Sequence, residues 1–409
     1  MKLFVVEPLG AGGMIHYAYQ MCAALAQTGA DVTLVTAKKY EMEPFPHNFR
    51  VEKRLDLWTL FDPRSMEGPP PNRLQALGRK IHWTARRGLR AIRLIREWLR
   101  LTNYLLAQKP DVIQFGKINF PFEAFFLARL RRRGLVLTQI CHEFELREQS
   151  GLAANLSNRL YASVYSQFSA LFFHAESNRA RFKTLFDVPP ARLHLIPHGN
   201  EGMFLSMIDG SVSADELRQR HKLDPAAPVI LFFGILTASK GIPDLLRAFA
   251  LVHRQQPRAR LVIAGYPTKY INMNELHALT AELGVVEAVI FDGRYIPFDE
   301  VGPLMELAAV VVYPYRNSTQ SGALQVAYAF GKPVIATNVG GLPEAVDEGR
   351  SGQLVPPQDP PALAAAMLKF IENPQLSVEM GAYARRLSET RYSWRPIAAK
   401  IMVIYQDLI

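Results

Sequence analysis

The sequence predicts an α/β protein of two doubly wound domains, and three observations lead to this prediction. Short apolar runs rich in β-branched residues, such as 308–313 (AAVVVY), recur along the whole chain without the alternation of a half-exposed strand. Amphipathic stretches of helical period separate these runs, and glycine-rich turns follow several of them. A chain of 409 residues exceeds one usual domain, so we expect two domains of about 200 residues each.

The first half opens with a βαβ unit: a strand at 2–8, the turn Gly10–Gly13, a helix at 14–29 and a strand at 31–37. Further buried strands are expected at 110–116, 134–143, 170–177 and 193–200. We expect the second half to place its strands at 228–234, 259–265, 288–293, 308–314 and 332–337. The predicted domains are 1–204 and 205–392, and the final helix (393–409) is expected to cross back to the first domain.

The segment 318–346 carries a small polar loop, a helix beginning near Gly322, a buried strand and a second glycine loop at Gly340 and Gly341. A helix start offers free backbone N–H groups and the positive end of the helix dipole, which together suit a phosphate. Ligands of doubly wound sheets bind at the carboxyl ends of the strands, where these loops lie. The alternative is that the glycines only form the turns of an ordinary α/β domain.

Composition excludes several classes of protein. The content of 49% hydrophobic and 21% charged residues is that of a folded globular chain, and no stretch approaches the ~18 apolar residues of a membrane span. The start lacks the order of a signal peptide, so we expect a cytoplasmic protein. Cys22 and Cys141 fit neither a disulfide nor a metal pattern and are expected to pack in the core.

Charge is concentrated in the first half. Residues 1–200 carry 28 basic and 16 acidic side chains, whereas residues 201–409 carry 19 and 21. The most basic segment, 79–106, is predicted to be a helix with an arginine face and an apolar face of Ile92, Ile95, Trp98 and Leu99. Such a helix suits an anionic membrane surface, with Arg86, Arg90 and Arg93 as candidate contacts. The alternative is a core-packed helix with a solvated arginine face. No nucleic-acid-binding motif accompanies the charge.

Taken together, the motifs resemble those of the glycosyltransferases of family 4, which are retaining enzymes with the GT-B fold of two Rossmann-like domains that face a cleft. The resemblance covers nearly the whole chain. It rests on the order of six segments: GGMIHYAYQMCAALAQTGADVTLVT, His142 after a strand, LIPHGN, FFGILTASKGIPDLLRAF, AFGKPVIATNVGGLPEAV and YSWRPIAAKIMVIYQ.

The resemblance implies that a nucleotide-diphosphate sugar binds mainly to the second domain and that the acceptor approaches from the first. Lys240 matches the family lysine that neutralises the diphosphate, and Gly13 and His142 match positions near the reacting sugar. Asn200 matches a further motif position. The candidate donor-binding residues are Gly12, Gly13, Gly234, Lys240, Arg294, Arg316, Thr319, Gln320, Ser321, Gly322 and Glu344.

The sequence departs from the family at two places. Family members have two glutamates in the positions of Ser318 and Val326, the second of which holds the nucleotide ribose. A valine cannot accept a hydrogen bond, so the ribose must be held elsewhere. Ile235 stands where the family has an arginine, and we expect Arg316 or Arg294 to supply that charge.

The implied function is transfer of a hexose, with retained configuration, to a glycan or lipid-linked acceptor in cell-surface polysaccharide or glycolipid synthesis. Neither a cofactor nor a metal is expected, because the chain has no Asp-x-Asp motif. One alternative is a GT-B protein that binds a nucleotide sugar but has lost or altered its activity, and another is a nucleotide-sugar epimerase. A dehydrogenase is disfavoured because the first loop lacks the spaced G-x-G-x-x-G pattern.

Overall fold

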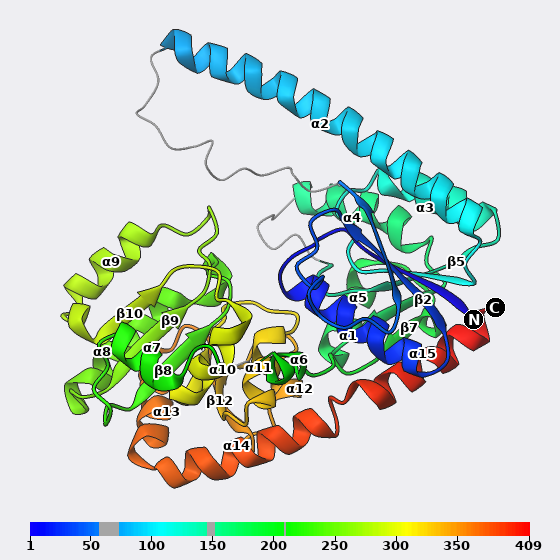
Figure 1. The fold of residues 1–409 in the computed structure, drawn as a ribbon. Helices are drawn as coiled ribbons and strands as arrows, with labels where there is room; N and C mark the ends of the chain where they lie inside the picture. The colour runs from blue at the N-terminus through cyan, green and yellow to red at the C-terminus, as the bar shows by residue number, and fades with distance from the viewer. Residues whose placement is uncertain (57–72, 145–151, 208–209) are drawn as a thin grey trace. The chain divides into compact units, whose positions relative to one another are not determined.

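The computed structural model describes residues 1–56, 73–144, 152–207 and 210–409; the side chains of 73–89 and 152–157 are outside the description. The chain forms two compact units. Unit 1 comprises Met1–Phe173, Arg179–Ile196 and Arg395–Ile409, and unit 2 comprises His174–Asn178 and Pro197–Trp394. Each unit is built around one parallel sheet, which confirms the predicted fold class (Figure 1).

The sheet of unit 1 has seven strands in the order β3-β2-β1-β4-β5-β6-β7, and all neighbours are parallel. The strands are β1 (Lys2–Glu7), β2 (Asp31–Ala37), β3 (Arg50–Leu55), β4 (Val112–Phe115), β5 (Val136–Ile140), β6 (Ala170–Phe173) and β7 (Leu193–Leu195). The central residues of β1, β2, β4, β5 and β6 are almost fully buried, as expected for strands that helices cover on both faces. The sequence did not predict β3, because RVEKRL is polar and lies at the sheet edge.

The helices that belong to unit 1 are α1 (Gly13–Gln27), α2 (Arg73–Gln108), α3 (Glu123–Arg132), α4 (Leu152–Tyr165), most of α5 (Glu176–Leu185) and α15 (Trp394–Leu408). One core cluster joins α2, α3, α4 and α5 to one face of the sheet. Helix α15 is tied to the sheet by a buried hydrogen bond, in which the Tyr405 hydroxyl donates to Gln114 Oε1 over 2.7 Å. Cys22 and Cys141 are buried in unit 1, as the sequence predicted.

Helix α2 confirms the predicted helix but corrects its apolar face. The buried stripe consists of Leu94, Trp98, Leu101 and Leu105, which follow one another at steps of four, three and four residues. Ile92, Ile95 and Leu99, which the sequence analysis placed on the same face as Trp98, are instead 66%, 45% and 37% exposed. The reason is that Leu94 and Leu101, one turn before and one turn after Trp98, complete its buried face. Ile92, Ile95 and Leu99 lie about 60–120° around the helix axis from Trp98.

The sheet of unit 2 has six parallel strands in the order β10-β9-β8-β11-β12-β13. The strands are β8 (Val229–Phe233), β9 (Arg260–Ala264), β10 (Val289–Asp292), β11 (Ala308–Tyr313), β12 (Val334–Thr337) and β13 (Gly352–Val355). The helices are α6 (Met203–Ser206), α7 (Ala214–Arg220), α8 (Ile242–Gln255), α9 (Met273–Glu282), α10 (Phe298–Leu307), α11 (Gly322–Ala329), α12 (Leu342–Ala345), α13 (Pro360–Glu372) and α14 (Pro374–Glu389).

Each sheet has a topological switch point, where the strand order reverses. In unit 1 the reversal lies between β1 and β4, and in unit 2 it lies between β8 and β11. The carboxyl ends of these strand pairs lead into the glycine loop before α1, the Gly234–Gly241 loop and the loop before α11. These are the places where doubly wound sheets bind ligands.

Among the described residues, no helix combines the length and the apolar character that crossing a bilayer requires.

Candidate functional site at the switch points

The two loops at the switch point of unit 2 are packed against each other. Gly241 has φ +68°, and a Cβ on it would lie 1.9 Å from the carbonyl oxygen of Pro314, so only glycine permits this approach. The Arg316 backbone N–H donates to the carbonyl oxygen of Ser239 over 2.8 Å. The loop that carries Lys240 is therefore fixed against the segment that leaves β11.

Lys240 ends a short 3₁₀ turn, Ala238–Lys240, and its side chain is half-buried. Its ammonium nitrogen lies 3.5 Å from the centre of the Tyr315 ring. The Tyr315 hydroxyl is in turn 3.2 Å from Ser321 Oγ. This arrangement places a cation, an aromatic ring and the start of α11 in one connected group.

Ser321 is the N-cap of α11, because its Oγ accepts a hydrogen bond from the Leu324 N–H over 3.2 Å. The loop before it, which includes Thr319 and Gln320, packs against the second glycine loop. A Cβ on Gly340 would lie 1.5 Å from the Ser318 carbonyl oxygen, and a Cβ on Gly341 would lie 2.3 Å from that of Thr319. The structure thus brings together the two glycine loops that the sequence analysis singled out.

The two arginines proposed to replace the missing family arginine differ in position. Arg316 makes a bidentate ion pair with Asp244 at 2.8 and 2.9 Å, and Asp244 lies in the first turn of α8, which follows the Lys240 loop. Arg294 follows β10, and Asp292 and Glu300 bind its guanidinium. Arg316 therefore belongs to the Lys240 group, and Arg294 belongs to a separate ionic cluster with Arg220.

Glu344 and Asn200 make backbone contacts. Glu344 accepts hydrogen bonds from the N–H groups of Glu176 and Ser177 at 2.6 and 2.8 Å. Burial acts to raise the pKa of Glu344, but these bonds outweigh it and hold the pKa below its usual value. Asn200 Nδ2 donates to the Ser388 carbonyl oxygen over 2.8 Å. Both side chains hold loops of unit 2 in place.

In unit 1 the glycine loop is held by a residue that sequence reasoning missed. Gly12 has φ +85° and precedes the first turn of α1, and its N–H donates to Glu41 Oε1. The same oxygen lies 2.6 Å from His16 Nε2, and the Glu41 N–H donates to the Gly10 carbonyl oxygen over 2.9 Å. Gly13 is the first residue of α1, and apart from its chain neighbours and the backbone of its own helix, no heavy atom of the described residues lies within 4 Å of the position its Cβ would take. No short-range pattern predicts the role of Glu41, because 29 residues separate it from Gly12.

Two buried groups lie at the ends of β1 and β5. Glu7 ends β1, and its carboxylate accepts a hydrogen bond from the Leu9 N–H over 2.9 Å. Burial raises the pKa of Glu7 to about 7, against the smaller opposing effects of that bond and of Lys117. A Cβ on Gly116 would lie 2.1 Å from Glu7 Oε2, so the glycine after β4 makes room for the carboxyl. His142, just past β5, is buried, and its ring packs edge-on to Tyr17 at 4.7 Å.

Comparison with known proteins agrees with this geometry. A glycosyl transferase 4-like domain matches residues 12–199, and a group 1 glycosyl transferase domain matches residues 227–373. The chain belongs to glycosyltransferase family 4. The family 4 chain is 31% identical over 255 residues to the D-inositol 3-phosphate glycosyltransferase of Jonesia denitrificans, covering 59% of this chain and 58% of that protein.

A second relative is the GDP-mannose-dependent alpha-(1-6)-phosphatidylinositol monomannoside mannosyltransferase of Mycolicibacterium smegmatis, which is 29% identical over 238 residues (56% of this chain, 60% of that protein). The family 4 chain therefore spans a little over half the length of the curated relatives it matches.

Solved structures of the same fold cover the whole chain. Sucrose-phosphate synthase from Thermosynechococcus elongatus aligns with a TM-score of 0.74 at 20% identity, covering 100% of this chain and 98% of that one. HepE of Anabaena in complex with UDP aligns with a TM-score of 0.72 at 18% identity, covering all of both chains.

At the positions of the two family glutamates this chain has Ser318 and Val326, neither of which is acidic. Ser318 is buried, and its Oγ donates to the Gln320 carbonyl oxygen over 2.8 Å. Val326 is 3% exposed on α11, one turn after Gly322.

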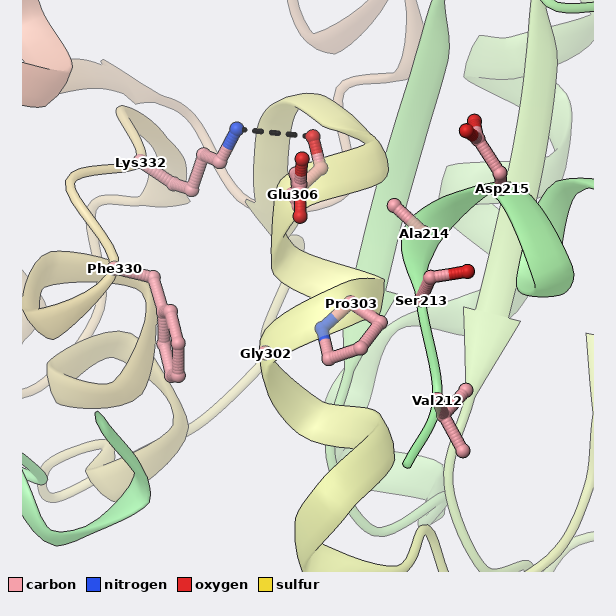
Figure 2. A pocket seen from close by; sticks show the side chains of 9 residues that line it. All are labelled: Val212, Ser213, Ala214, Asp215, Gly302, Pro303, Glu306, Phe330 and Lys332. Carbon is pink, nitrogen blue, oxygen red and sulfur yellow. Dashed lines mark hydrogen bonds between the residues drawn. The ribbon is translucent and has the colours of Figure 1, made fainter. Parts of the chain in front are cut away.

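A surface pocket of about 430 Å³ in unit 2 contains none of the predicted site residues (Figure 2). Val212, Pro303, Phe330 and Lys332 are among its lining residues. The Lys332 ammonium donates to the Glu306 carbonyl oxygen over 3.2 Å (Figure 2). It also donates to the Ala308 carbonyl oxygen over 2.9 Å. The pocket offers neither a glycine loop nor the start of a long helix, so we assign the candidate site to the switch points.

Proposed function

We propose that this family 4 chain is a retaining hexosyltransferase that moves a sugar from a nucleotide-diphosphate sugar to a glycan or lipid-linked acceptor in polysaccharide or glycolipid synthesis. The observation that carries the proposal is the connected group of Lys240, Tyr315 and Ser321 at the β8/β11 switch point. Lys240 and the first N–H groups of α11 suit the negative charge that grows on a departing diphosphate.

The named relatives support the substrate class. Two of them are named for transfer to inositol 3-phosphate and to a phosphatidylinositol mannoside, and one solved structure of the same fold holds UDP. Because the chain spans only part of those relatives, their particular substrates are not carried over. The proposal is a donor held by unit 2 and an acceptor held by unit 1.

The test is a panel of nucleotide sugars in a thermal-shift assay, followed by incubation of each stabilising donor with candidate acceptors. A ligand present at about 100 times its Kd adds about 2.7 kcal/mol of stability, which a melting curve resolves. Transfer with the donor's anomeric configuration, measured by NMR, is the expected result. Binding without hydrolysis or transfer would select the non-catalytic alternative, and a changed sugar nucleotide formed without acceptor would select the epimerase. Transfer is expected to persist in EDTA.

We further propose that unit 1 is peripheral at the inner face of the cell membrane. Helices α2 and α3 lie side by side (Figure 1), and Trp98 packs on Phe126 with ring centres 5.6 Å apart. Apolar side chains are exposed beside this contact: Ile92, Ile95 and Leu99 on α2, Phe122 just before α3 and Phe125 on α3. Among the candidate arginines, Arg90 is half-buried and Arg93 is paired with Asp56, while the Arg86 side chain lies outside the described residues. The exposed apolar side chains therefore support this proposal more strongly than the arginines do.

Sedimentation with anionic liposomes tests the membrane proposal. Replacing Ile92 and Phe125 by serine should release the protein, because each exposed side chain loses its apolar burial in the bilayer interface. Replacing Arg90 and Arg93 by glutamine should weaken binding in a salt-dependent manner. Val378→Ser, at a site in unit 2 with 65% exposure, is the matched control. Binding by both variants at the parent's level would exclude the membrane surface.

A further inference from the structure

Because residue 326 is a valine, α11 lacks the carboxylate that the family resemblance implies for binding the nucleotide ribose. The structure places another carboxylate near this position. On α11, residues 322 and 326 lie one turn apart on the same face, about 5–6 Å from Cβ to Cβ. Helical side chains slant toward the N-terminus, so a glutamate at 326 would extend over residue 322. In this chain residue 322 is glycine, so α11 itself places no side chain on that part of its surface.

A different carboxylate lies at this place. Glu201 Oε1 is 3.5 Å from the position that a Cβ on Gly322 would take, and Glu201 itself is 3% exposed. His198 lies beside it, with Cε1 at 3.5 Å and Nε2 at 3.8 Å from the same position. Both residues come from the segment after β7, which the chain connects to α6.

The segment that carries Glu201 is fixed by its neighbours in unit 2. Gly199 has φ +83°, and a Cβ on it would lie 2.4 Å from the Trp394 indole. The Trp394 indole N–H donates to the Asn200 carbonyl oxygen over 2.9 Å, and the Asn200 N–H donates to that of Tyr392 over 2.7 Å. Glu201 is therefore presented from a rigid backbone, as a binding residue requires.

His198 has a defined protonation state. Burial lowers the pKa of His198 to about 4, against the smaller effect of its bond to Gly199. The ring is neutral at pH 7, and Nδ1 donates to the Gly199 carbonyl oxygen over 3.0 Å. Nε2 then carries the lone pair, which is the form that accepts a hydrogen bond from a hydroxyl.

We propose that Glu201, assisted by His198, supplies the carboxylate that binds the ribose hydroxyls of the donor nucleotide, in place of the side chain absent at Val326. This inference rests on the proposed function. It makes Glu201 a specificity-determining residue that has moved from α11 to the segment after β7. Glu201 places its carboxylate at the same face of the first turn of α11, although it lies 125 positions before Val326 in the chain.

The test combines a change in the protein with a change in the ligand. Affinities for UDP and for 2′,3′-dideoxy-UDP are measured by isothermal titration calorimetry, and GDP with its dideoxy analogue forms a second pair. The parent should prefer the hydroxylated nucleotide by about tenfold to hundredfold, the range of hydrogen bonds to a charged group. Glu201→Gln should bring this ratio close to one and leave the affinity for the dideoxy nucleotide unchanged. Glu306→Gln, an exposed acid of the same unit, should keep the parent's ratio.

An exchange variant guards against a merely structural effect. Glu201→Gln combined with Val326→Glu returns a carboxylate to α11 and should restore the preference for the hydroxylated nucleotide. If Glu201→Gln is insoluble, Glu201→Asp, which withdraws the carboxylate by one methylene, should lower the ratio. A parent ratio retained by Glu201→Gln or by Glu201→Asp overturns the assignment. A parent that binds neither UDP nor GDP overturns the proposed function, and the assignment falls with it.

Discussion

Replacing Lys240 by methionine is expected to lower kcat by a factor of about 10² to 10³ and to leave the fold intact. The ammonium lies 3.5 Å from the Tyr315 ring in a half-buried loop. A unit charge acting over about 4 Å at an effective dielectric constant of 20 contributes about 4 kcal/mol, which agrees with the ~2.7–4 kcal/mol measured for single oxyanion donors. Methionine keeps the apolar stem, and the loss of the cation–π contact lowers the free energy of unfolding by about 0.5–1 kcal/mol.

The assay is the rate of nucleotide-diphosphate release at saturating donor, with a melting curve for each variant. Lys269→Met is a matched control, because Lys269 also lies over a tyrosine ring of unit 2, that of Tyr270 at 4.8 Å. Its rate should equal that of the parent. A Lys240→Met rate within threefold of the parent's, or an equal loss in Lys269→Met, would refute the electrostatic role of Lys240.

Three further predictions concern the loops around the site. The stability of Glu7→Gln relative to the parent should rise between pH 5 and pH 8, by at most about 3 kcal/mol in the free energy of unfolding measured in urea. The reason is that burial raises the pKa of Glu7 from 4.5 to about 7, so the stability that the protonated carboxyl contributes below pH 4.5 is lost from the parent as pH rises through 7. A difference that does not depend on pH would contradict this. Gly199→Ala should lower the melting temperature much more than Gly284→Ala, since both glycines have positive φ but only Gly199 has a side chain, that of Trp394, where the Cβ would go; equal losses would show that backbone strain alone matters. Ser321→Val should remove the N-cap of α11, which is worth about 1 kcal/mol, and should weaken UDP binding in the same titrations. Ser321→Thr should keep both the cap and the affinity. An unchanged affinity in the valine variant would show that this loop does not bind the donor.

Local pattern predicted most of the fold because buried parallel strands have a distinctive composition. The run at 308–313 has the bounds of β11, and the final helix predicted at 393–409 agrees with α15 to within one residue at each end. Edge strand β3 and the short strand β13 were missed, since RVEKRL and GQLV are polar or too short to show a buried run. On α2 the helix was predicted correctly, but the choice between Leu94 and Ile92 as the buried side depends on where α3 packs, which the sequence of α2 does not contain.

The candidate site was predictable where its residues follow strand ends and unpredictable where they arrive from elsewhere. The loops with Lys240 and Ser321 follow β8 and β11, so the buried apolar runs of these two strands in the sequence predicted where the loops lie. Glu41 and Glu201 approach their glycine loops through long-range contacts and carry no local motif of their own. For Glu201 a signal did exist, because it directly follows the segment LIPHGN that supported the family resemblance.

The division of the chain has a consequence for biosynthesis. Unit 1 is completed only by Arg395–Ile409, so its sheet reaches its last covering helix after all of unit 2 has left the ribosome. Until then Gln114, which is buried beneath α15, lacks the hydroxyl of Tyr405, and the apolar face that receives Ile397 and Ile401 is open to water. Unit 2 needs no later segment, so it should mature first although it is translated second. A chain truncated after residue 394 should therefore combine a protease-resistant second unit with a first unit that a chaperone still recognises.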